Sequence, residues 1–245
     1  MWTRAELKEK AKLAMNRNYW YCVLAGFLIS LIAGGSGYLT MIYNAGSSAG
    51  TDVASWEGFF QYGTLDWKPF GLFGIFAVIL AMFSAVLSMA WTYLVVQPIQ
   101  EVGSSRFFIE NACGQTNIGK LFFAFSSGHF LKLVWALFLR SLFVTLWSFL
   151  FLVPGIIKYY EYRMVPYLLA DCPQMDRKSA FRISKELMRG QKWNVFVLDL
   201  SFLGWDILSA LTFGILQIFY VTPYKYATHA ELFLELKQQY FAGRE

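Results

Sequence analysis

Charged side chains inside long apolar stretches are the residues of this sequence best suited to bind a ligand or do chemistry. An unpaired charge at the centre of a bilayer costs at least about 2.5 to 3.5 kcal/mol on insertion scales. Such residues therefore pair with one another, meet water or hold a ligand. The sequence has six of them, our candidate ligand-binding residues: Arg140, Lys158, Glu161, Arg163, Asp199 and Asp206.

Two layers of opposite charge follow if these segments are straight helices. With a rise of about 1.5 Å per residue, Arg140 lies about 15 Å and Asp199 about 9 Å from the inner boundary, within reach of a long arginine. Asp206, Glu161 and Arg163 lie within about 12 Å of the outer boundary, and Lys158 belongs to the same layer. We expect either salt bridges that dock two hairpins or a polar cavity for a charged solute, a lipid headgroup or a peptide.

Other motifs carry less chemistry. Ser48 lies in Gly46-Ser47-Ser48-Ala49-Gly50, which matches Gly-x-Ser-x-Gly, but a nucleophile elbow needs a strand, a turn and a helix with His and Asp in reach. The histidines and cysteines lack the spacing of metal ligands, and neither a Walker-type loop nor a dinucleotide fingerprint occurs. We therefore expect no catalytic residue, no metal and no cofactor.

The composition indicates an integral membrane protein. The 245 residues are 57% hydrophobic and only 15% charged, against about 25% charged in soluble domains. Lysines and arginines gather in hydrophilic segments, so the net charge of +5 reports orientation in the membrane and excludes a nucleic-acid partner. The odd number of cysteines, three, predicts reduced thiols.

Long apolar segments predict the membrane spans, because about 20 apolar residues cross the hydrocarbon core. Pro154-Gly155 predicts a tight external turn between the third and fourth spans. The last segment is one tilted helix or two helices joined near Thr212-Phe213-Gly214, which gives five or six crossings. The segments are residues 19–43, 70–96, 130–153, 156–170 and 193–220.

An internal repeat favours six crossings. Pro98, Pro166 and Pro223 each lie late in the second helix of a presumed hairpin. Phe107-Phe108-Ile109-Glu110 has the same offset from Pro98 as Leu232-Phe233-Leu234-Glu235 has from Pro223. The predicted fold is all-α, a single membrane domain of three repeats, each an interfacial amphipathic helix followed by a hairpin. The repeats span residues 1–112, 113–173 and 174–245.

Two basic amphipathic segments set the orientation. Residues 3–16 begin with a Thr3-x-x-Glu6 capping box and carry an apolar face of Leu7, Ala11 and Ala14. Residues 177–192 follow Asp176, a helix cap, and carry Ala180, Ile183 and Leu187 on one face. Because positive segments stay in the cytoplasm, both termini are expected there.

Small residues also recur every fourth position on the first span, at Gly26, Ser30 and Gly34. This pattern predicts close helix contact.

Four stretches together resemble a known family. They are the opening Met-Trp-Thr-Arg-Ala-Glu-Leu-Lys, Pro-Gly-Ile-Ile-Lys-Tyr-Tyr-Glu-Tyr from Pro154, Ser184-Lys185-Glu186-Leu187-Met188, and Leu200-Ser201-Phe202-Leu203-Gly204-Trp205. In these four stretches the chain resembles bacterial multi-pass membrane proteins grouped as domain of unknown function nine-seventy-five. The resemblance implies residence in the bacterial cytoplasmic membrane and a repeated-hairpin fold, without a substrate.

A more distant likeness concerns the C-terminal part. Thr212-x-Gly214-Ile215 and Pro223-Tyr224 resemble membrane domains attached to glycerophosphodiester phosphodiesterases. No catalytic domain of that kind is present in the sequence, so the activity is not inherited.

We expect a non-enzymatic protein that binds, or helps to translocate, a polar, amphiphilic or peptidic ligand through the charged interface of hairpins two and three. The first alternative is an accessory or scaffold protein that docks partner membrane proteins and has no pore. The second is an intramembrane lipid-modifying enzyme. The expected partners are membrane lipids and either a membrane protein or a second copy of the chain.

Overall fold

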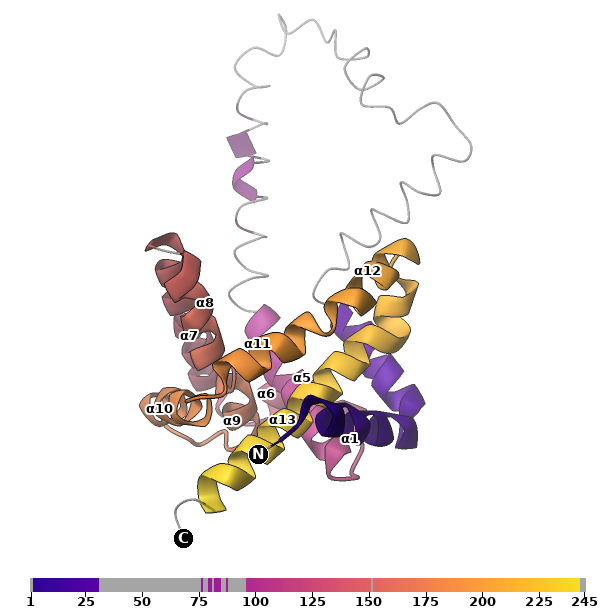
Figure 1. The fold of residues 1–245 in the computed structure, drawn as a ribbon. Coiled ribbons are helices and arrows are strands. Elements are labelled where there is room, and N and C mark those ends of the chain that lie inside the picture. The colour runs from indigo at the N-terminus through magenta and orange to yellow at the C-terminus, as the bar shows by residue number, and fades with distance from the viewer. Residues whose placement is uncertain are drawn as a thin grey trace, which may run out of the picture. The chain divides into compact units, whose positions relative to one another are not determined.

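The computed structural model describes residues 2–30, 76, 79–80, 82–84, 87, 96–150 and 152–242. Within these residues the chain is helical and contains no strand. It divides into two compact units, residues 34–94 and residues 1–33 with 95–245. The second unit contains all six candidate residues and is the one described below (Figure 1).

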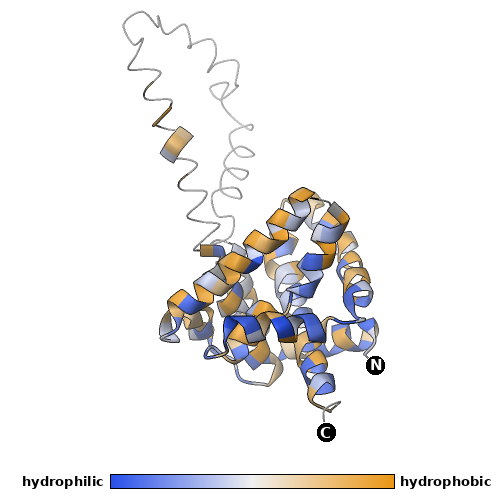
Figure 2. Ribbon diagram, turned by 90° about the vertical axis from the view of Figure 1, so that its left-hand side faces the viewer, coloured by the Kyte–Doolittle hydropathy of each residue, from blue (hydrophilic) through white to orange (hydrophobic). Residues whose placement is uncertain are grey.

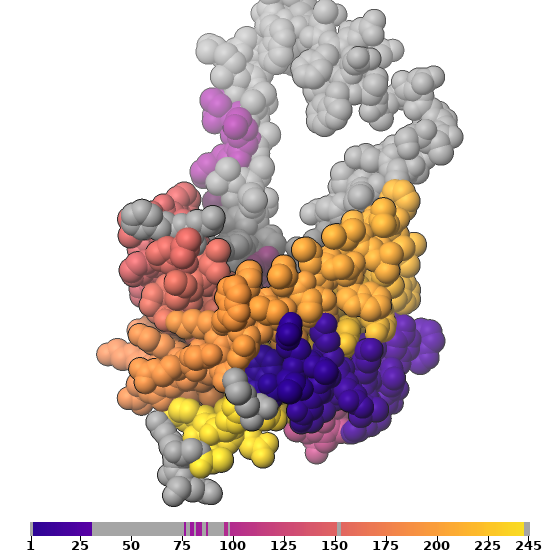
Figure 3. Space-filling view, in the orientation of Figure 1, coloured from indigo at the N-terminus to yellow at the C-terminus, as the bar shows by residue number. Residues whose placement is uncertain are grey.

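Helix α1 (Arg4–Arg17) forms as its sequence predicts. The hydroxyl of Thr3 accepts a hydrogen bond from the Glu6 amide at 3.3 Å, which satisfies one of the free N–H groups of the first turn. Leu7, Ala11 and Ala14 are buried, so the predicted apolar face is confirmed. This face packs on α13 (Thr222–Ala242), and Figure 3 shows α1 in indigo against the C-terminal helices.

The helix Tyr19–Ser30 continues from α1 and approaches the chain near Pro223 closely. A Cβ atom at Gly26 would lie 3.1 Å from Cδ of Pro223 and 3.2 Å from the carbonyl oxygen of Ile218. The close contact predicted from the small residues is thus confirmed at Gly26. The rest of the predicted first span, most of the second and the motif around Ser48 lie outside the described residues.

Three helices, each with a proline in its first turn, form the centre of this unit. They are α5 (Gln97–Ala112), α9 (Val165–Asp171) and α13. Proline suits this position because the first N–H groups of a helix have no partner within it. Pro223 directly follows a π-helical turn, η3 (Gln217–Val221), so the α-helical hydrogen-bond ladder is interrupted just before the proline.

The core of this unit lies where these helices meet. Phe107, Phe108 and Phe233 are fully buried, and the rings of Tyr167 and Phe233 stack at 5.6 Å. The two sequence stretches with matching offsets therefore supply core residues to α5 and α13. The threefold repeat itself stays a prediction.

The second hairpin consists of α7 (Phe130–Leu150) and α8 (Leu152–Glu161), which lie side by side (Figure 1). Helix α5 leads to it through η2 (Ile118–Phe122) and α6 (Phe123–Ser126). A Cβ atom at Gly155 would lie 2.6 Å from Cα of Ser148, so glycine permits this close approach. The predicted turn at Pro154-Gly155 is wrong, because Pro154 and Gly155 both lie within α8.

The predicted continuous span over residues 156–170 is also wrong. Helix α8 ends at Glu161, residues 162–164 form a turn, and α9 begins just before Pro166. Proline ends helices because it disfavours helical geometry in the residue before it and donates no hydrogen bond. Helix α9 is buried from Val165 to Ala170 and belongs to the core.

The third hairpin follows α10 (Arg177–Leu187), which Asp176 caps as predicted by accepting a 3.2 Å hydrogen bond from the Lys178 amide. Its first limb consists of α11 (Lys192–Leu200) and α12 (Leu203–Leu211). A turn at residues 212–214 ends it, with positive φ angles of 51° at Phe213 and 80° at Gly214. The predicted join between two helical segments near Thr212 is confirmed.

Two helices are long and apolar enough to cross a membrane, Phe130–Leu150 and Lys192–Leu211. Only 22% of the most apolar window of each is buried, whereas the core helix of a soluble protein is mostly buried. Phe149 is 88% exposed and Leu131 78% exposed. Figure 2 shows polar residues gathered toward the end of this unit that carries α1 and the end of α13.

Candidate functional site

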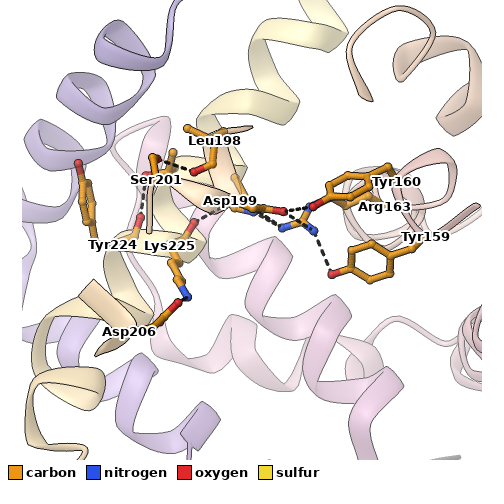
Figure 4. Close-up of polar contacts among 11 residues, drawn as sticks. Tyr159, Tyr160, Arg163, Leu198, Asp199, Ser201, Asp206, Tyr224 and Lys225 are labelled. Carbon is orange, nitrogen blue, oxygen red and sulfur yellow. Dashed lines mark hydrogen bonds and ion pairs between the residues drawn. The ribbon is translucent and has the colours of Figure 1, made fainter. Parts of the chain in front are cut away.

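The centre of the charged interface is Asp199 on α11. Val195 and Leu198, on the same side of this short helix, are buried, so Asp199 projects toward the neighbouring helices rather than outward. Its side chain is 26% exposed. Its partners come from α8, from the turn after α8 and from α13 (Figure 4).

Arg163, in the turn after α8, forms a bidentate ion pair with Asp199. Nη1 lies 3.1 Å from Oδ2 and Nη2 lies 3.1 Å from Oδ1. The guanidinium also lies over the rings of Tyr159 and Tyr160, at 5.4 and 5.6 Å from their centroids, and donates to the Tyr159 hydroxyl at 3.0 Å. A planar guanidinium suits both contacts, because it matches a carboxylate edge and stacks on aromatic faces.

Two further side chains complete this group, which we call the Asp199 cluster (Tyr159, Tyr160, Arg163, Asp199 and His229). The Tyr160 hydroxyl donates to Asp199 at 2.9 Å, and Tyr160 is only 8% exposed. Nε2 of His229, on α13, lies 2.9 Å from Asp199 Oδ1 and also contacts Arg163 Nη2.

The environment of His229 favours the neutral ring. Its Nδ1 lies 3.0 Å from the Lys225 carbonyl oxygen, so Nδ1–H donates there and the lone pair of Nε2 faces the Arg163 guanidinium. Burial, followed by the charges of Arg163 and Lys225, lowers the pKa of His229 well below 6.5. The Asp199 carboxylate is therefore neutralised mainly by Arg163 and not by a histidinium.

A second group of charged residues surrounds Glu161, the last residue of α8. Glu161 is 6% exposed. Its two carboxylate oxygens are divided between two lysines: Lys158 lies 2.7 Å from Oε2 and Lys192 lies 2.6 Å from Oε1. The Ser184 hydroxyl donates to the Glu161 carbonyl at 2.7 Å and ties α10 to the same point. A pocket of about 380 Å³ opens beside this carboxylate.

The remaining two candidates form separate pairs. Arg140 on α7 is 9% exposed and lies 2.6 Å from Glu101 on α5. Asp206 on α12 lies 2.6 Å from the ammonium group of Lys225 on α13. The backbone carbonyl of Lys225 also accepts from His229, so α13 links this pair to the Asp199 cluster.

The predicted pairing of the charges is therefore wrong in both layers. Arg140 contacts Glu101 instead of Asp199, and Asp206 contacts Lys225 instead of the residues of the second hairpin. The structure does bring the second and third hairpins together through charge, but by the pairs Arg163–Asp199 and Glu161–Lys192.

Sequence reasoning missed four partners: Glu101, Lys192, Lys225 and His229. All four lie outside the predicted spans, so the sequence does not indicate them as partners of charges within the spans. The prolines at positions 98 and 223 are the signal that could have found Glu101 and Lys225, because each starts a helix that returns to the core.

Among the described residues no group of three or more His, Cys, Asp or Glu side chains could hold a metal ion.

A second pocket is apolar and has a volume of about 200 Å³. It lies between the helix Tyr19–Ser30, α5 and residues 121–125.

Residues 152–240 match the family model described as a protein of unknown function (DUF975). This confirms the family resemblance over α8 to α13, a region that contains all the candidate residues except Arg140. The likeness to membrane domains of glycerophosphodiester phosphodiesterases stays a prediction. No curated protein and no solved structure matches the chain.

Proposed function

We propose that this chain, which carries a DUF975 domain, is a multi-pass protein of the bacterial cytoplasmic membrane that binds a charged amphiphilic ligand where its second and third hairpins meet. One observation carries the proposal. The Glu161 pocket opens at the junction of α8, α10 and α11, next to helices whose apolar side chains are exposed. A pocket lined by charged side chains beside an apolar surface suits a ligand with a charged head and an apolar body.

Six crossings with both termini in the cytoplasm are part of the proposal. The basic helices α1 and α10 and the polar end of this unit support cytoplasmic termini.

A scaffold without a ligand is the second candidate, and one observation favours it. All six candidate residues already have a partner within the chain. Breaking a buried ion pair costs about 3 to 5 kcal/mol, so such pairs can serve to hold hairpins together alone. In that case the exposed faces of α7 and α12 would contact partner membrane proteins.

Cysteine labelling separates the two candidates. In a variant without native cysteines, single cysteines at Lys185, Asp199 and Leu146 are exposed to a membrane-impermeant maleimide on inside-out vesicles. We expect fast labelling at Lys185 and none at Leu146, which is 63% exposed but faces lipid in the proposed arrangement. Slower labelling at position 185 in the presence of added lipid supports ligand binding, whereas labelling at the same rate with and without lipid favours the scaffold.

Two outcomes contradict the membrane arrangement itself. Labelling of Leu146 as fast as Lys185 would remove α7 from the bilayer. A C-terminal reporter fusion that is active only on the outer side would exclude the three-repeat topology with six crossings.

A further inference from the structure

Three of the six residues that line the Glu161 pocket are basic. Its lining comes from the end of α8, the end of α10 and the start of α11. The pocket holds three cations against one carboxylate, a surplus of two positive charges. The lining residues are Glu161, Lys185, Arg189, Gly190, Lys192 and Trp193.

The positive charge in this pocket is available to a ligand. Both oxygens of Glu161 are already engaged by Lys158 and Lys192. In the part of the chain that the structure describes, the side chains of Lys185 and Arg189 form no hydrogen bond or ion pair. Both are exposed, so binding an anion there breaks no existing contact.

The start of α11 adds further attraction for an anion. No side chain caps this helix, which is 9 residues long, and its first residues line the pocket. Free N–H groups and the helix dipole at such an end favour phosphate oxygens. Gly190 has a φ of 75°, and a Cβ there would meet nothing within 4 Å, so this side of the pocket is open.

The position of the pocket also indicates the kind of ligand. Lys192 is the first residue of the apolar helix Lys192–Leu211, and Trp193 beside it is 71% exposed. Tryptophan is enriched at the headgroup level of membranes, with basic residues on the cytoplasmic side.

We infer that the Lys185–Arg189–Lys192 pocket binds the phosphate of an anionic lipid headgroup, with Trp193 against the upper part of the acyl chains. The inference rests on the proposed membrane arrangement and names the ligand class of the Glu161 pocket. Lys185 and Arg189 supply the charge, and the start of α11 supplies N–H donors.

The test uses the full chain in a neutral detergent and measures binding of dioctanoyl phosphatidylglycerol, dioctanoyl phosphatidylcholine and inorganic phosphate by calorimetry. We expect a clear preference for phosphatidylglycerol over phosphatidylcholine. Each basic residue contributes about a fivefold change in affinity near a membrane surface, so K185A/R189A should weaken binding about 25-fold.

The matched control is K178A/R182A. It removes a lysine and an arginine with the same spacing on α10, outside the pocket, and should leave the affinity unchanged. Because the side chains of Lys185 and Arg189 form no hydrogen bond or ion pair among the described residues, K185A/R189A should keep the thermal midpoint of the wild type.

Several results decide the matter. Equal affinity for the two lipids, or equal weakening by both double variants, would overturn the site. Phosphate that binds as tightly as phosphatidylglycerol, and is lost in K185A/R189A, would identify a free anion as the ligand instead of a lipid. A chain that alkaline carbonate extracts from membranes would contradict the membrane arrangement, whereas an inserted chain without lipid preference contradicts only the headgroup site.

Discussion

Arg163 and Asp199 are joined by two parallel contacts of 3.1 Å, and this pair ties the second hairpin to the third. Arg163 lies in the turn between α8 and α9, and Asp199 lies on α11. Because the guanidinium also stacks on two tyrosine rings, its position is fixed on three sides. The pair thus defines the geometry of the whole charged interface.

Asp199→Asn should destabilise the protein. It leaves the Arg163 charge, on a side chain only 14% exposed, without an opposite charge. We expect a loss of about 2 kcal/mol, below the full cost of breaking a deeply buried pair because Asp199 is partly exposed. Thermal unfolding of the detergent-solubilised protein measures it.

Rescue identifies the true partner of Asp199. Adding Arg163→Met to Asp199→Asn should recover part of the lost stability, whereas adding Arg140→Met should lower it further because Glu101 is left alone. Rescue by Arg140→Met would contradict the pairing described above.

Glu161→Gln should have two opposite effects. Removing the carboxylate between Lys158 and Lys192 lowers the thermal midpoint, because two cations then lie close together without their counter-charge. The same change raises the positive charge of the pocket, so the affinity for phosphatidylglycerol should rise. Weaker binding in a folded Glu161→Gln protein would argue against the headgroup site.

His229 should make stability depend on pH. Its pKa is lowered in the folded chain, so below about pH 6.5, the usual value for an unfolded histidine, the unfolded state binds the proton more readily. The stability from the neutral ring is complete above this pH and is lost as the pH falls toward the folded-state pKa. We expect the thermal midpoint of the wild type to fall more than that of His229→Gln between pH 7.5 and pH 5.5.

The other histidine provides the control for this measurement. His129 lies in the loop before α7, away from the Asp199 cluster, and His129→Gln should keep the wild-type pH response. The same slope in the wild type and in His229→Gln would show that the neutral His229 ring does not stabilise the fold.

Gly103→Ala should disrupt the packing of α5 on η2. A Cβ atom there would lie 1.8 Å from the carbonyl oxygen of Leu121, so the backbone has to move. Overpacking of this kind costs about 1 to 3 kcal/mol. Thermal unfolding should show a clear loss of stability or no folded protein.

Gly204→Ala is the matched control on α12. A Cβ atom there meets nothing within 4 Å, so alanine should raise stability by about 1 kcal/mol through helix propensity. A stable Gly103→Ala protein would contradict the close approach of α5 and η2.

Local features of the fold could be predicted from the sequence because they depend on neighbouring residues. The cap at Thr3, the buried face of α1, the cap at Asp176 and the turn at residues 212–214 are confirmed. Each follows from a hydrogen bond or backbone preference within about one helical turn.

The charge pairing could not be predicted in the same way. Counting residues gives depth only along a straight helix, and the break at residues 162–164 places Arg163 beside Asp199. Glu101 and Lys225 lie on helices that have a proline in their first turn. The sequence of neither helix indicates that it contacts the charged interface, yet both residues form ion pairs there. The match to the family model does not say which charged residues pair with one another.

The packing of α1 on α13 has a consequence for synthesis in the cell. The apolar face of α1, with Leu7 and Ala11, is covered by a helix that the ribosome makes more than 200 residues later. During translation this face has no protein partner, and the membrane surface is the nearest apolar phase for an amphipathic helix. In the proposed membrane arrangement, α1 is therefore expected to bind the lipid surface while the hairpins insert, and to pack on α13 only after that helix has been made.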